Sequence, residues 1–94
     1  MNKSEAAAVL KHHIGQYRGK SYEKLITLVG NVQVHEVEGI FGASYTLEFD
    51  VVWDDKSKGD IRVIGAIDDG TLRNAISPLS DDFILTPDGR FVGE

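Results

Sequence analysis

The chain has 94 residues, of which 41% are hydrophobic and 27% charged, and its 15 acidic against 10 basic side chains give a formal net charge of −5. This length and composition predict one globular domain, residues 1–94, and exclude a second hydrophobic core. The absence of cysteine excludes disulfides, thiolate metal sites and a cysteine nucleophile. No stretch approaches the roughly 20 apolar residues of a membrane span, so we expect a cytoplasmic protein.

The charge is divided unevenly along the chain. Residues 1–24 carry five basic and two acidic side chains, whereas residues 25–94 carry five basic and 13 acidic ones. We therefore expect a molecule with a basic start and an acidic body. An acidic body repels phosphate backbones, so nucleic-acid binding is not expected, and it would attract a cationic partner protein. Simple solubility is the interpretation we favour for the charge itself, because a net charge of this size is ordinary for a small domain.

One or two helices are predicted at the N-terminus. Ser4 can cap the first helix, Gly19 can end it, and one apolar stripe runs along it through Ala6, Leu10, Ile14 and Tyr17. Residues 22–29 fit either a helix or a strand. We favour a short helix, because Ser21 supplies a cap and Gly30 stands where a C-terminal glycine belongs.

The pattern changes to strands after Asn31. Val37 is out of phase with Val32 and Val34, which predicts a bulge or a strand end near His35 and Glu36. The strongest strand signal runs from Ala43 to Trp53, where apolar side chains occupy every second position. The next strand has the same alternation, at Ile61, Val63, Gly65 and Ile67.

These two alternating patterns predict the pairing of their strands, because only one register parity places both apolar sets on one face. A turn centred on Ser57 pairs Phe49 with Gly65, so that the ring covers bare backbone. The other face then has an apolar centre and charged edges, typical of a partner surface, and consists of Glu48, Asp50, Val52, Arg62, Ile64 and Ala66. The alternative is that the C-terminal segment covers this face through Phe83, Leu85 or Phe91.

The C-terminal third predicts a further strand and a short hairpin. Residues 72–76 can return along the sheet before Pro78 ends the strand, and residues 86–89 suit a type I turn between 83–85 and 90–92. The predicted fold is α+β: one or two N-terminal helices packed on a curved antiparallel meander of about four strands, with a short C-terminal hairpin. This element order resembles the cystatin-like and NTF2-like folds. Residues 59–94, from GDIRVIGAIDDG to the end, also resemble a family of small uncharacterised bacterial proteins, and the resemblance implies no activity.

Two segments resemble known ligand loops but lack essential residues. Residues 15–21 end in Gly-Lys-Ser like a phosphate-binding loop, yet only three residues separate the glycines and a helix precedes them. Residues 54–60 begin like a calcium loop, yet lysines stand where oxygen ligands are required. Residues 68–69 and 81–82 are aspartate pairs that could hold a cation if folded together, but aspartate is also a common turn residue.

The histidines offer little catalytic chemistry. His13 borders the apolar stripe of the first helix, and His12 is expected to face solvent. His35 could form an acid–base pair with Glu38, although a surface or edge histidine is the more usual arrangement. We therefore predict no catalytic, cofactor-binding or metal-binding residue, and we lean against an enzyme.

The sequence leaves three interpretations of function. The leading one is a non-enzymatic binding or regulatory module that self-associates, as a homodimer, or engages a protein partner through a sheet face or edge. The second is a small ligand-binding domain or enzyme with a pocket between helix and sheet, lined by Tyr17, Tyr45, Phe49 and Trp53. The third is an acidic inhibitor or immunity protein that neutralises a basic partner. None of them involves a membrane or a nucleic acid.

Overall fold

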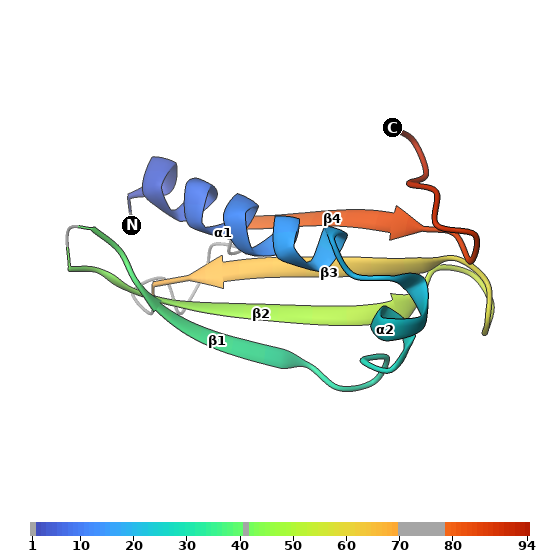
Figure 1. The fold of residues 1–94 in the computed structure, drawn as a ribbon. Helices are drawn as coiled ribbons and strands as arrows, with labels where there is room; N and C mark the ends of the chain where they lie inside the picture. Colours follow the sequence, from blue (N-terminus) through green and yellow to red (C-terminus); the bar gives the residue numbers. More distant parts are fainter. Residues whose placement is uncertain (1, 41, 70–78) are drawn as a thin grey trace.

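The architecture is one helical layer on one open sheet, seen in a computed structural model that describes residues 2–40, 42–69 and 79–94. The elements are α1 (Lys3–Arg18), α2 (Tyr22–Ile26), β1 (Gln33–Glu38), β2 (Ser44–Trp53), β3 (Ile61–Asp68) and β4 (Leu79–Leu85). The strands form an antiparallel sheet in the order β1-β2-β3-β4, and α1 packs on one face of it, over β3 and β4 (Figure 1). This confirms the predicted α+β fold.

Helix α1 begins two residues earlier than a Ser4 cap would allow. The side chain of Asn2 accepts a hydrogen bond from the backbone N of Glu5 at 3.0 Å, so Asn2 is the cap and Ser4 lies in the first turn. Asparagine caps helices as well as serine does, and here it comes first in the chain. The predicted apolar stripe is confirmed, since its members are buried: Ala6, Leu10, Ile14 and Tyr17. Gly19 is the C-cap, as predicted.

Helix α2 has the predicted cap but is shorter than predicted. The Ser21 hydroxyl accepts a hydrogen bond from the backbone N of Lys24 at 3.1 Å, yet the helix ends at Ile26. Val29 instead forms a parallel bridge with Val51, which draws the chain out of the helix. Gly30 then has a positive φ of 84°, a conformation that favours glycine, and it turns the chain towards β1.

The bulge or strand end predicted near His35 and Glu36 is wrong. Strand β1 pairs with β2 without interruption from Gln33, opposite Phe49, to Glu38, opposite Ser44. The alternation of β1 follows Val37 and not Val32 and Val34, so the side chains of His35 and Val37 lie on the α1 side of the sheet. Val32 and Val34 remain 52% and 57% exposed. An edge strand can leave valines exposed in this way, because only part of its surface joins the core.

The predicted register of β2 and β3 is confirmed from Trp53 opposite Ile61 to Leu47 opposite Ile67. It places an entire apolar face against the helices. The core side chains of these two strands are at most 1% exposed: Tyr45, Leu47, Phe49, Val51, Ile61, Val63 and Ile67.

The last strand extends the sheet on the β3 side. The predicted strand at residues 72–76 lies outside the described residues, and β4 pairs with β3 from Leu79 opposite Ile67 to Leu85 opposite Ile61. The predicted terminal hairpin is confirmed by the bridge between Leu85 and Phe91 and by a hydrogen bond from Gly89 N to Thr86 O at 2.9 Å.

The C-terminal aromatic residues pack on the helix side. Phe83 lies opposite Val63 and is 3% exposed, and its ring contacts that of Phe91. Leu85 shares this face of β4 and is also buried. The alternative in which these three side chains cover the outer face is therefore wrong.

Candidate functional site

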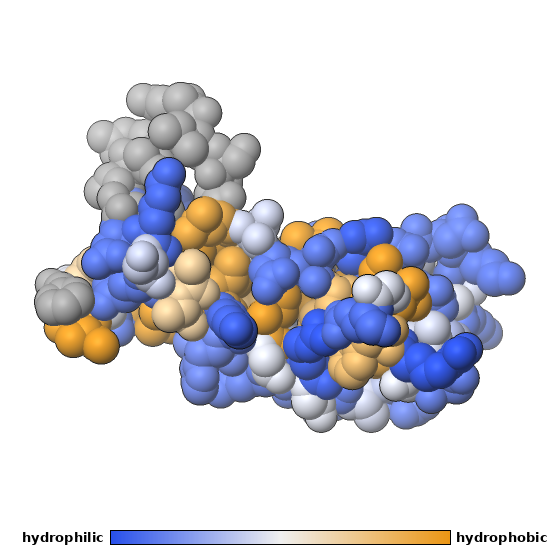
Figure 2. All heavy atoms as spheres, turned by 90° about the horizontal axis from the view of Figure 1, so that it is seen from above, coloured by the Kyte–Doolittle hydropathy of each residue, from blue (hydrophilic) through white to orange (hydrophobic). Residues whose placement is uncertain are grey.

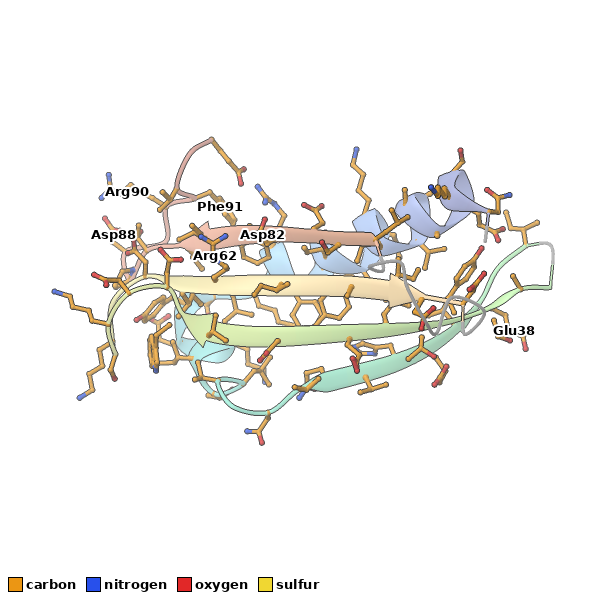
Figure 3. All side chains as sticks on the ribbon, turned by 180° about the vertical axis from the view of Figure 1, so that it is seen from behind. Glu38, Arg62, Asp82, Asp88, Arg90 and Phe91 are labelled. Atoms are coloured by element: carbon orange, nitrogen blue, oxygen red, sulfur yellow. The ribbon has the colours of Figure 1, made fainter. Side chains whose placement is uncertain are left out.

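The face of the sheet opposite α1, here called the open face, holds the candidate partner surface. The register brings all six of its predicted residues together as three neighbouring pairs: Glu48 with Ala66, Asp50 with Ile64, and Val52 with Arg62. Figure 3 views the sheet from this side, with α1 behind the strands. A shallow hollow of about 220 Å³ opens on it between Thr46, Glu48, Ala66, Ile67 and Asp68.

The two outer strands enlarge this surface. Strand β1 places Val34 beside Glu48, and β4 places Ile84 beside Arg62, so apolar side chains extend across the sheet. Within β1–β4 the alternation of the strands assigns six carboxylates and one guanidinium to the open face: Glu36, Glu38, Glu48, Asp50, Asp68 and Asp82, with Arg62. The open face is therefore both acidic and partly apolar.

Arg62 is already neutralised by its neighbours. Its guanidinium donates to the Oδ1 atom of Asp54 at 3.0 Å and also forms an ion pair with Asp82 (Figure 3). The hydrogen bonds that the guanidinium donates, to Asp82 first and to Asp54 second, raise the pKa of Arg62. Among the described residues of the strands, the one cation of the open face is thus engaged within the chain, and carboxylates are the commonest charged groups of these strands on this face.

The helical layer has the opposite charge. Of the seven charged side chains in residues 1–24, five are basic, and these residues form α1, the link after it and the start of α2. The uneven charge predicted along the chain therefore becomes a difference between the two layers. The side of the molecule seen in Figure 2, from above α1 and β4, mixes hydrophobic patches with hydrophilic ones, as small protein surfaces usually do.

The residues of the predicted helix–sheet pocket lie in or beside the packed core. Tyr17, Tyr45 and Phe49 are 6%, 1% and 0% exposed. The rings of Tyr17 and Phe49 stack with centroids 4.3 Å apart, and half-buried Trp53 packs against the edge of the core. The space between these side chains is filled by the side chains themselves.

The histidines are placed differently from one another. His12 is exposed, as predicted, and His13 bonds through Nδ1 to the Val9 carbonyl at 3.0 Å. His35 lies on the edge strand, but its partner is Tyr17 rather than Glu38, because the phenol oxygen is 3.0 Å from the His35 Nε2 atom. The His13 and His35 rings lie 6.0 Å apart across α1 and β1. The sequence analysis missed this contact. The signal for it is Val37, because His35 lies two residues before it on the same strand and therefore shares its core-facing side.

The remaining sequence candidates are separated or occupied. Residues 54–60 form a turn closed by the Asp54 N to Asp60 O bond of 2.8 Å. Asp68 and Asp82 lie at different levels of the sheet, since Asp82 pairs with Ile64, about 13 Å along β3 from Asp68. In residues 2–40, 42–69 and 79–94, no three metal-ligating side chains are grouped to hold an ion. No helix in these ranges is long and apolar enough to cross a membrane.

Residue alternation in the sequence could locate only part of the open face. The register of β2 and β3 follows from their apolar positions, but the contributions of β1 and β4 depend on the strand order. No protein-family model, curated protein or solved structure matches this chain, so the resemblance of residues 59–94 to a bacterial family stays a prediction.

Proposed function

We propose that the chain is a non-enzymatic protein-binding module whose open face docks on a cationic protein surface. The observation that carries the proposal is the composition of that face in the described strands, where six carboxylates lie among apolar side chains and the one guanidinium is ion-paired within the chain. The apolar side chains are Val34, Val52, Ile64, Ala66 and Ile84. An apolar centre gives a partner surface to bury, and charged edges steer a complementary partner.

The same composition argues against face-to-face self-association. A two-fold dimer through the open face would bring two acidic surfaces together, and like charges across an interface oppose binding. A basic partner would gain binding energy from both the carboxylates and the apolar side chains of the face, whereas a second copy of the chain would gain it from the apolar side chains alone. This reasoning favours the inhibitor-like interpretation of the sequence over a dimer built on the face.

The proposal can be tested by a titration followed by NMR. The probe is a synthetic peptide of lysine and leucine residues, added to the isotope-labelled chain at low salt. We expect the largest backbone amide shifts on β2 and β3, around Asp50 and Ile64. We also expect the affinity to fall as salt rises, because exposed charges are screened. Shifts centred on α1 would contradict the proposal.

Three variants separate docking from simple charge attraction. Ile64→Asp adds a negative charge but removes apolar surface. If the peptide docks on the apolar side chains, this variant should bind it more weakly; if only charge attracts the peptide, the variant should bind it more strongly. Ile40→Asp makes the same change at a side chain that is 90% exposed on the β1–β2 loop, and it serves as the matched control. Arg62→Gln exposes Asp54 and Asp82, and it is expected to strengthen binding. Tighter binding by Ile64→Asp would overturn the proposal.

A second candidate function, homodimerisation through the edge of β1, rests on a different observation. The Gly39 N to Ala43 O bond of 2.7 Å sets the ladder so that the backbone groups of Val34, Glu36 and Glu38 point away from β2. The edge is unbulged and presents exposed valines, features that invite another strand. Suppose that the β1 strands of two copies pair antiparallel, with the two His35 residues facing each other. Val34 then lies opposite Glu36 of the partner subunit, and no two carboxylates lie directly opposite each other.

Light scattering on a sizing column tests this second candidate. Val34→Pro removes the one outward donor at that position and leaves the ladder to β2 intact, so a β1-edge dimer becomes a monomer. Val34→Ala keeps the donor and should stay dimeric. A wild-type monomer at high micromolar concentration, or a dimer that survives Val34→Pro, would exclude the edge dimer.

A further inference from the structure

A hollow of about 270 Å³ lies on the other side of the molecule, where the end of α1, α2 and β1 meet. Its charged lining residues are two lysines, Lys20 and Lys24, in a chain whose net charge is −5. In the described part of the chain neither ammonium forms an ion pair with a carboxylate. The Lys20 Nζ atom lies 5.8 Å from the centre of the ring of Tyr17, which also lines the hollow.

The uncharged lining residues are mostly hydrogen-bonding groups. Gln16 of α1 and Gln33 of β1 contribute side-chain amides, and the Tyr17 hydroxyl and His35 imidazole bond to each other at the base of the hollow. Leu28 adds an apolar wall. Amide and ammonium donors around a small space, with one ring and one aliphatic group beside them, suit an anion that carries an organic substituent.

We propose that this hollow binds a small organic phosphate monoester. Two ammonium groups match the two negative charges of a monoester, and the amide of Gln16 can donate to its oxygens. The Gln33 amide already donates to Asn31 O at 3.2 Å and has a second N–H for the ligand. The Tyr17 ring and Leu28 contact the organic group. The hollow is slightly smaller than the roughly 300 Å³ at which ordinary ligand pockets begin, which limits the ligand to the size of a fragment.

The site does not use the backbone in the manner of a phosphate-binding loop, although Lys20 belongs to the Gly-Lys-Ser segment. The Ser21 hydroxyl is occupied by Lys24 N, and the carbonyls of Gln16 and Tyr17 accept from Gly19 N and Lys20 N. The carbonyls of Gln16 and Tyr17, which belong to residues that line the hollow, are thus engaged with the backbone. The proposed site consists of side chains.

The experiment is an NMR titration of the labelled chain with phenyl phosphate, inorganic phosphate and benzoate. We expect phenyl phosphate to shift the signals of Gln16, Lys20 and the His35 ring. It should bind at least about tenfold more tightly than the other two anions, because only it offers both a dianion and a ring. Equal affinity for inorganic phosphate would exclude the organic contact, and equal affinity for benzoate would exclude the dianion match.

Two double variants of equal net charge complete the test. Lys20→Gln with Lys24→Gln removes the proposed cations, whereas Lys3→Gln with Lys11→Gln removes two cations from α1, outside the hollow. The first pair should weaken phenyl phosphate binding by at least about tenfold and the second by less than about twofold. Equal losses in the two pairs would overturn the proposal, because they would reflect general charge attraction alone.

Discussion

Phe49 lies directly across the sheet from Gly65, and a Cβ atom added at Gly65 would lie 2.5 Å from Cε1 of its ring and 3.1 Å from Cδ1 of Leu10. The ring thus occupies the space that a side chain on β3 would need. It also closes the core beneath α1, since Leu10 belongs to the buried stripe of that helix. One glycine therefore allows the sheet and the helix to approach each other.

Gly65→Ala should destabilise the fold by about 1–3 kcal/mol, because both neighbours of the new methyl group are buried and must shift. The measurement is urea unfolding followed by circular dichroism. Gly15→Ala is the matched control. Apart from its chain neighbours and the backbone of its own helix, nothing lies within 4 Å of the added Cβ, and alanine in a helix interior should stabilise the chain by about 1 kcal/mol. Equal effects at both positions would contradict this account of Gly65.

Glu5 connects the start of α1 to β2 and to the loop after β1. Its carboxylate accepts from the Tyr45 hydroxyl at 2.7 Å and from Ile40 N at 2.9 Å. The hydrogen bond to Glu5, with burial and the nearby charges of Glu5 and Asp69, raises the pKa of Tyr45 to about 12. Because an unfolded tyrosine titrates near pH 10, the pairing stabilises the fold fully below about pH 10, and this stabilisation is lost as the pH rises towards 12.

Glu5→Gln should therefore lower the pKa of Tyr45, since glutamine retains an acceptor oxygen but removes the charge. The pKa is measured from the ring carbon signals of Tyr45 as the pH is raised. Glu23→Gln makes the same change at an exposed position of α2 and should leave the titration of Tyr45 unchanged. A Tyr45 pKa that is the same in both variants would rule out the proposed role of Glu5.

Arg18, at the end of α1, holds the C-terminal hairpin against the helix. Its guanidinium lies 4.4 Å from the centre of the Phe91 ring and 5.2 Å from that of Phe83, and it also pairs with Glu94. Arg18→Lys keeps the charge but loses the planar group that stacks on the rings, so it should cost about 1 kcal/mol of unfolding free energy.

Arg90→Lys is the control for this prediction. Arg90 pairs with Asp88, but its side chain is 78% exposed, and exposed ion pairs contribute little to stability. Unfolding by urea, together with the Phe91 ring signals, distinguishes the two variants. If Arg18→Lys leaves both observables at their wild-type values, the cation–ring contact does not hold the hairpin.

These contacts show which parts of the fold the sequence could predict. The register of β2 and β3 followed from strict alternation, which Phe49 opposite Gly65 exemplifies. Strand β1 was harder, because an edge strand buries little, and its exposed Val32 and Val34 outweighed the single core-facing Val37 in the pattern. Side-chain contacts between distant segments have no local periodicity, so Arg18 on Phe91 could not be predicted from the sequence.

The open face, too, was only partly predictable from the sequence. Its centre follows from the β2–β3 register, whereas the carboxylates of Glu36 and Asp82 join it only because β1 and β4 lie at opposite edges of one sheet. The hollow at Lys20 was not predictable, because it depends on how α2 turns the chain between α1 and β1. Strand order and helix packing are properties of the whole chain, and alternation within one strand does not encode them.

The hydrogen bond between Tyr17 and His35 connects β1 to the helical layer. The two atoms are 3.0 Å apart, and Tyr17 is 6% exposed, so the bond is partly shielded from water. A double-mutant cycle of Tyr17→Phe and His35→Ala, measured by urea unfolding, should give a coupling energy of about 0.5–1.5 kcal/mol. The control cycle pairs Tyr17→Phe with His12→Ala, at the exposed histidine of α1, and should give a coupling near zero. If the His35 cycle also gives zero, the bond does not help to hold the edge strand to α1. The ladder to β2 and the packing of Val37 against the core would then account for the position of β1.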